Sequence, residues 1–111
     1  MLKKSLTVKA SGVPATIHVA DNVAINYATN RTNVDVTSFY NEDAQANGLT
    51  PLNKATVTLE GIPAAGQDAR DFAEAELIKA APAGTTVKEV LESFGMDRYA
   101  FQGATLAAAT A

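Results

Sequence analysis

The sequence contains no cysteine and no tryptophan, and its only histidine is His18. Without cysteine the chain can form no disulfide, no thiolate nucleophile and no cysteine-based zinc site. Histidine and cysteine carry much of the side-chain catalysis that operates near pH 7, so a single histidine leaves little room for it. We therefore expect a protein that is not an enzyme and that binds no cofactor.

Charge of either sign is also scarce, since charged residues make up 19% of the chain and the formal net charge is −3. A nucleic-acid partner would call for a basic face, which the scattered lysines and arginines do not predict. No stretch approaches the length of an apolar membrane span, and no apolar core of a signal peptide follows Met1–Lys4. We expect no nucleic-acid or membrane partner, and a location in the cytoplasm or in a virion assembled there.

Large apolar side chains are few, with four Phe and three Tyr, while alanine supplies about a fifth of the residues. A chain of 111 residues corresponds to one domain, here 1–111. A core this thin gains stability when part of its surface is buried against a partner. The composition therefore favours a single domain that associates with itself or with another protein.

The amino-terminal half alternates apolar and polar residues with the period of a strand, bounded by Gly, Pro, Asn and Asp. Alternation of this kind is typical of antiparallel sheets with one covered face. A turn is predicted at Asp21-Asn22, between the second and third strands. The five predicted strands are 6–10, 15–20, 23–28, 34–37 and 55–59.

Helical spacing appears in the carboxyl-terminal half. An apolar stripe predicts a helix over Gln67–Ala81, and a capping box of Thr86 with Glu89 predicts a second, short helix that ends before Gly95. A last strand is indicated near Phe101, followed by a tail of small residues at 103–111. The predicted fold is α+β, an antiparallel sheet of about five strands with two C-terminal helices packed on one face.

The segment Gly84–Met96, followed by Tyr99–Phe101, resembles the passage from helix to strand in ubiquitin-like β-grasp proteins, which include sulfur carriers. The resemblance implies a helix in this segment. The sequence ends in Ala-Thr-Ala, where such carriers have the Gly-Gly that is activated, so no function is transferred from this family.

An internal echo joins two distant segments, because Val8–Ala15 and Val57–Ala64 both read V-x-x-x-G-[V/I]-P-A. A strand followed by Gly and then by an apolar-Pro step predicts two similar strand ends. Such ends could be neighbours in one sheet.

A polar, turn-rich loop is predicted at 41–53, longer than most connections in a small domain. An exposed aromatic pair at its start would act as an interface anchor, whereas a buried pair would close the core. The candidate interface residues are Phe39, Tyr40, Glu42, Asp43 and Leu49.

Other chemistry-bearing residues have simpler interpretations. His18 is expected to face solvent or to be hydrogen-bonded, and a metal site would need partners such as Asp21 or Asp35. The run of acids from Asp68 to Glu76 is read as a solvated helix face, with cation binding or acid–base work as the alternative. We predict no metal site, and the sequence contains no glycine-rich phosphate loop.

We therefore expect a non-enzymatic structural subunit that self-assembles, with a homo-oligomer or another protein as partner. A phage virion component, such as a capsid-decoration or tail protein, fits the composition best. One alternative is a monomeric protein-binding module that uses residues 39–53. A second is a small enzyme, or enzyme subunit, that uses carboxylates.

Overall fold

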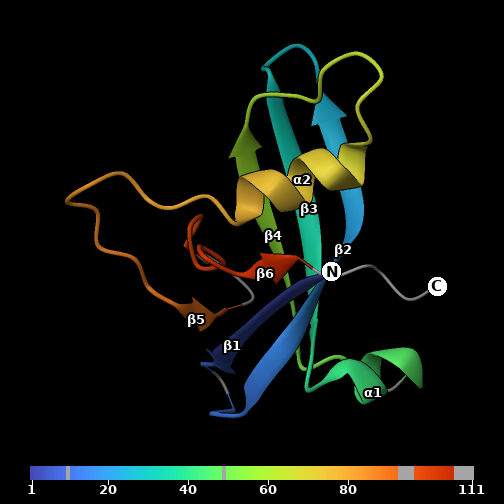
Figure 1. Cartoon of the computed structure of the whole chain (residues 1–111), viewed down its shortest axis with the longest axis vertical. Helices are drawn as coiled ribbons and strands as arrows, with labels where there is room; N and C mark the ends of the chain where they lie inside the picture. The colour runs from blue at the N-terminus through green and yellow to red at the C-terminus, as the bar shows by residue number, and fades with distance from the viewer. Residues whose placement is uncertain (10, 49, 93–96, 107–111) are drawn as a thin grey trace.

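The computed structural model describes residues 1–9, 11–48, 50–92 and 97–106. Strands dominate this part of the chain, and the two helices are short (Figure 1). In chain order the elements are β1 (Leu2–Val8), β2 (Pro14–Asn26), β3 (Arg31–Phe39), α1 (Glu42–Ala46), β4 (Asn53–Glu60), α2 (Ala69–Leu77), β5 (Val90–Leu91) and β6 (Thr105–Leu106).

The strands form one sheet in the order β4-β3-β2-β1-β5. The strands β1 to β4 form an antiparallel meander. The edge of β1 that faces away from β2 pairs with two short strands. β5 pairs in parallel with Thr7–Val8, while β6 pairs antiparallel with Leu2–Lys3. The sheet curls on itself into a nearly closed, barrel-like form.

The core lies inside the curl, where the alternating apolar residues of the strands meet. Val34, Val57 and Leu59 are fully or almost fully buried on the inner face of β3 and β4. Helix α2 lies across this face (Figure 1) and contributes Phe72 and Leu77. The period-2 pattern thus identifies the inner face, as expected for strands with one covered side.

The expected fold class is wrong, because the sheet of the described residues has six strands and these residues form only one of the two predicted C-terminal helices. The first, predicted at Gln67–Ala81, is the shorter α2. The second, predicted at Thr86–Phe94, is absent from its described residues, where Val90–Leu91 is a strand. Pairing with the edge of β1 buries Leu91 completely, and this outweighs the local capping signal.

The turn predicted at Asp21-Asn22 is also wrong, because β2 runs through both residues. The register with β3 skips Asp21 between Ala20 and Asn22, which makes this site a β-bulge. The Thr37 hydroxyl donates a hydrogen bond to the Asp21 carboxylate. The chain reverses later, at Asn30, whose φ of 53° is in the left-handed region that Asn tolerates.

The carboxyl-terminal segment differs from the expected strand as well. Among residues 97–106 only Thr105–Leu106 forms a strand, and the turns before it bury Phe101 completely. The helix implied by the β-grasp resemblance is absent from the described residues of its segment. Within the predicted loop at 41–53, the short helix α1 begins after Asn41, whose side chain accepts from the Ala44 amide at 2.8 Å. Residues 107–111 of the predicted tail lie outside the described residues.

The internal echo marks two strand ends that are alike in conformation but not adjacent. Gly12 and Gly61 have φ values of 72° and 93°, which explains why both positions are glycine. The strands that precede them, β1 and β4, are separated by β2 and β3 in the sheet. The expectation of similar ends is confirmed, and that of neighbouring strands is wrong.

Candidate functional site

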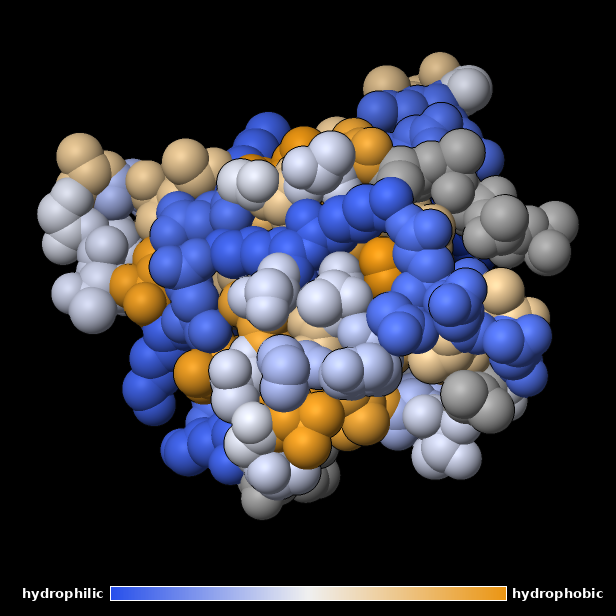
Figure 2. All heavy atoms as spheres, turned by 60° about the horizontal axis from the view of Figure 1, so that its bottom comes forward, coloured by the Kyte–Doolittle hydropathy of each residue, from blue (hydrophilic) through white to orange (hydrophobic). Residues whose placement is uncertain are grey.

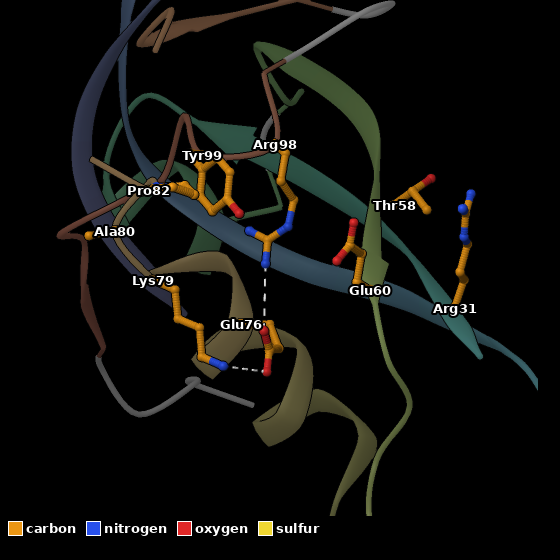
Figure 3. A pocket seen from close by; sticks show the side chains of 9 residues that line it. All are labelled: Arg31, Thr58, Glu60, Glu76, Lys79, Ala80, Pro82, Arg98 and Tyr99. Atoms are coloured by element: carbon orange, nitrogen blue, oxygen red, sulfur yellow. Dashed lines mark hydrogen bonds and ion pairs between the residues drawn. The ribbon is translucent and has the colours of Figure 1, made fainter. Parts of the chain in front are cut away.

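The sheet comes closest to closing at one end of β4 and stays open at the other. At the start of β4, the Asn53 side-chain amide donates to the Glu92 carbonyl in a long hydrogen bond of 3.5 Å. At the other end, a cleft of about 730 Å³ opens beside Thr58 and Glu60 (Figure 3). The cleft is lined by Arg31, Thr58, Glu60, Glu76, Lys79, Ala80, Pro82, Arg98 and Tyr99.

The register shows, for each residue of β4, whether its backbone amide and carbonyl point toward β3 or away from it. The Gly61 amide donates to the Asn30 carbonyl at 2.8 Å, in line with the register of β4 against β3. Backbone groups alternate along an antiparallel strand, so Leu59 and Val57 bond to β3. The amide and carbonyl of Thr58 then point away from β3.

Side-chain contacts support this assignment. Residues opposite each other without mutual backbone bonds lie closest in an antiparallel pair. The Thr58 hydroxyl donates to Asn33 at 2.9 Å, and the Thr56 hydroxyl donates to Asp35 at 2.7 Å. Both are directly opposite pairs in the register. In the described part of the chain, no strand pairs with this outward side of β4.

Arg98 lies on the wall of the cleft that faces β4 and is the most unusual group there. Its side chain is 23% exposed and its guanidinium sits 4.8 Å from the centre of the Tyr99 ring. The nearest acid is Glu76, 3.6 Å from Nη2, and Glu76 also receives Lys79 Nζ at 2.8 Å. The Arg98 Nη1 atom is buried and has no hydrogen-bond partner among the described residues.

Two further charges line the cleft from the sheet side. Arg31 begins β3 and Glu60 ends β4, directly opposite each other in the register. Neither forms an ion pair with another described residue. The cleft therefore combines outward backbone groups, three cations and two carboxylates.

His18 is buried and hydrogen-bonded within the core. Nε2 lies 2.7 Å from the Lys4 carbonyl and Nδ1 lies 2.8 Å from the Ser38 hydroxyl. A carbonyl only accepts, so Nε2 carries the proton and Ser38 donates to Nδ1. The ring packs against Phe101 with centroids 4.8 Å apart. Burial lowers the pKa of His18 to about 4, and the nearby Lys4 ammonium adds to this effect.

Lys4 anchors the carboxyl-terminal turns beside this histidine. Its ammonium donates to the carbonyls of Ala100 and Gln102 at 3.0 and 2.8 Å and pairs with Glu89. Together with the His18 ring, it holds the turn that inserts Phe101 into the core. His18 and Lys4 thus hold the carboxyl-terminal turns against the sheet.

The acids of α2 do not act as one cluster. Asp68 caps the helix by accepting from the Asp71 amide at 3.1 Å. Glu74 is buried and pairs with the Met1 ammonium, and Glu76 lines the cleft. The expectation of a wholly solvated face is therefore wrong at Glu74. No group of three acids or histidines suited to a metal ion occurs among the residues that the structure describes.

The residues expected to form an interface are placed differently from one another. Phe39 is half-buried at the end of β3, whereas Tyr40 is 54% exposed. Glu42 and Asp43 are exposed in the first turn of α1 and line a shallow hollow of about 570 Å³. Within it, Lys3 pairs with Glu42. Leu49 lies outside the described residues.

Sequence reasoning missed the cleft, because its lining comes from four separate segments. Strand β4 itself is predicted at 55–59, and alternation identifies its two faces. Which strand becomes the edge of the sheet depends on pairings between distant segments, for which the sequence gives no local signal. The nearest signal in the sequence is the pair Arg98-Tyr99, a cation beside an aromatic residue, which carries no information on the distant segments that meet it.

Comparisons with protein-family models, with curated proteins and with solved structures found no match to this chain.

Neither helix in the described ranges has the length and apolar character needed to cross a membrane. On the face seen in Figure 2, hydrophobic residues reach the surface in separate patches between hydrophilic ones.

Proposed function

We propose that the protein is a non-enzymatic structural subunit that self-associates, with the free edge of β4 accepting an extended segment of a neighbouring copy. The observation that carries this proposal is the outward-pointing backbone of β4 beside an open cleft. Unpaired amides and carbonyls along a strand are a template for another strand.

The sequence of β4 leaves this edge without the usual protection. Edge strands in monomeric proteins are commonly blocked by proline, by a bulge or by a charge in the middle of the strand. In β4 the backbone groups that point away from β3 belong to Lys54, Thr56, Thr58 and Glu60. The two charged residues lie near the ends of the strand, and the two threonines lie in its middle. Eight regular residues pair with β3 without a bulge, which keeps the edge straight enough to accept a partner.

A subunit of a phage particle, such as a capsid-decoration or tail protein, is the assembly that we favour. This part of the proposal rests on composition alone: low charge, abundant small residues and a thin core. Identical subunits that accept a segment from the next copy form rings or filaments, depending on whether the rotation closes.

The test is the native mass measured by light scattering after size exclusion, over a wide range of protein concentration. The wild-type mass should rise with concentration above 11.5 kDa. Thr58→Pro removes an outward amide without breaking a bond to β3, so it should abolish the rise. Thr58→Ala is the matched control, because it loses the same side chain and keeps the amide.

A wild-type protein that stays monomeric at every concentration would refute the proposal. So would association that Thr58→Pro leaves unchanged while the variant stays folded by circular dichroism. Equal association of the wild type and Thr58→Ala is required if the backbone, and not the hydroxyl, makes the contact.

A second candidate is a monomeric module that binds another protein through residues 39–53. The specific observation in its favour is the exposure of Tyr40, whose carbonyl is fixed by the Thr16 hydroxyl at 2.8 Å. Tyr40→Ala should abolish capture of such a partner with almost no change in thermal stability. A large loss of stability would instead assign Tyr40 to packing.

A further inference from the structure

We infer that the cleft beside β4 selects an extended segment that carries a carboxylate side chain, and that Arg98 binds this carboxylate. The inference rests on the proposed function, because it specifies the chemistry of the segment that adds to the edge. It concerns the far wall of the cleft, which the backbone pairing of β4 does not use.

The Arg98 guanidinium has donors that the described residues leave unused. Five N–H donors in a planar fork match a carboxylate, which accepts two of them side by side. In the structure Nη2 is 3.6 Å from Glu76, longer than a hydrogen bond, and Nη1 is buried without a partner. A small rotation of the guanidinium toward the cleft would let both atoms donate to one carboxylate.

The side chains that line the cleft carry a net positive charge. Arg31, Lys79 and Arg98 outnumber the carboxylates Glu60 and Glu76 by one. Glu76 is shared between Lys79 and Arg98, one on each carboxylate oxygen, so its single negative charge offsets only one of the two cations. One incoming carboxylate makes the cleft neutral, whereas an incoming lysine would raise its charge to two.

Arg98 lies across the cleft from the edge of β4 that would receive the added strand. A strand added to β4 lies about 4.8 Å from it and directs alternate side chains to opposite faces. Figure 3 shows the Arg98 guanidinium directed toward Glu76, with Tyr99 on one side of it and Glu60 on the other. A side chain that leaves the added strand on this side meets Arg98, with Tyr99 holding the guanidinium from behind at 4.8 Å.

Glu60 would be an internal competitor for the same cation. Its carboxylate faces Arg98 across the cleft in Figure 3, but the two form no ion pair in the structure. Weak attraction across the cleft would oppose an incoming carboxylate. Removing this charge with Glu60→Gln should therefore tighten binding of an acidic segment, by about two- to five-fold, as for an exposed ion pair.

The experiment uses two blocked pentapeptides, Thr-Val-Glu-Val-Thr and the same peptide with Gln in place of Glu. Each is titrated into the full-length wild-type protein while amide shifts are recorded by NMR. The Glu peptide should bind about tenfold more tightly or better, as charge-assisted hydrogen bonds exceed neutral ones. The shifted amides should include Thr56 and Thr58.

Substitution at Arg98 then separates geometry from charge. In Arg98→Gln the difference between the peptides should disappear. Arg98→Lys keeps the charge but loses the planar fork, so it should restore only a small part of the difference. An unchanged preference for the Glu peptide in Arg98→Gln would overturn the inference. The wild-type comparison of the two peptides stands even if a variant fails to fold.

The peptide results and the mass measurement can fail separately. If both peptides bind equally and shift the β4 amides, the edge accepts a strand but the assignment of Arg98 is wrong. If neither binds while the wild type still associates and Thr58→Pro does not, the proposed function stands and this inference falls. If the Glu peptide is preferred by a strictly monomeric protein, the inference stands and self-association falls.

Discussion

Acidification from pH 7 to pH 5 should destabilise this protein through one residue, His18. The buried ring has a pKa of about 4 in the folded state against 6.5 when exposed, chiefly because burial disfavours the charged form. The unfolded chain therefore binds more protons between these values, and stability rises with pH across this window. Below pH 4 both states are protonated and the loss is complete.

The magnitude follows from the two pKa values. At pH 5 the unfolded histidine is almost wholly protonated, whereas the folded one is about a tenth protonated. The free energy of unfolding should fall by about 2 kcal/mol between pH 7 and pH 5 and by about 3 kcal/mol below pH 4. Asp35 and Glu92 also have lowered pKa values, but their stabilisation is lost only as the pH falls below their ordinary pKa values of 3.8 and 4.5, so they leave the change between pH 7 and pH 5 to His18.

Urea denaturation followed by far-ultraviolet circular dichroism at pH 7, 6 and 5 measures this loss. His18→Gln is the paired variant, since an amide can donate to the Lys4 carbonyl and accept from Ser38 without titrating. The variant should be less stable than the wild type at pH 7 and nearly independent of pH down to 5. Equal slopes for the two proteins, or a folded-state NMR titration of His18 near 6.5, would refute the reasoning.

Two substitutions test the packing of the core and the turn that follows β4. Phe101→Ala should lower the free energy of unfolding by about 3–5 kcal/mol in urea melts, because it removes a fully buried ring from the core; a loss under 1 kcal/mol would mean that the turn repacks. Gly61→Ala should lower the free energy of unfolding by about 1–2 kcal/mol, because its φ of 93° is strained for alanine. Steric clash adds nothing to this loss, since the new Cβ would lie 3.9 Å from Phe72, an ordinary contact distance. An unchanged midpoint for Gly61→Ala would show that this turn relaxes.

The strands were predictable because each carries its own signal. The alternation in 55–59 identifies Val57 and Leu59 as inward residues, and both are buried in the structure. The same pattern could not separate a bulge from a turn at Asp21-Asn22. Both arrangements suit polar residues, and only the pairing of Ala20 and Asn22 with β3 distinguishes them.

Long-range pairing overrode local preference in the last third of the chain. Thr86 and Glu89 match the sequence pattern of a capping box, and the apolar stripe of this segment has helical spacing. β-branched residues in the same segment suit a strand equally well, and the edge of β1 offers Val90 and Leu91 a partner. This pairing joins segments that are far apart in the chain, so the local sequence around Val90 and Leu91 cannot indicate it.

The candidate site was the least predictable part, because it depends on how the barrel fails to close. Strand β5 is two residues long and pairs only with the end of β1, so it does not extend along the far half of β4. The turns at 97–104 lie opposite this half of β4 instead of a strand. They bury Phe101 in the core and place Arg98 at the cleft. One turn therefore fills the interior and supplies a cation at the open edge. A change at Phe101 should consequently disturb Arg98, whereas Arg98 can be replaced without removing the ring that the core requires.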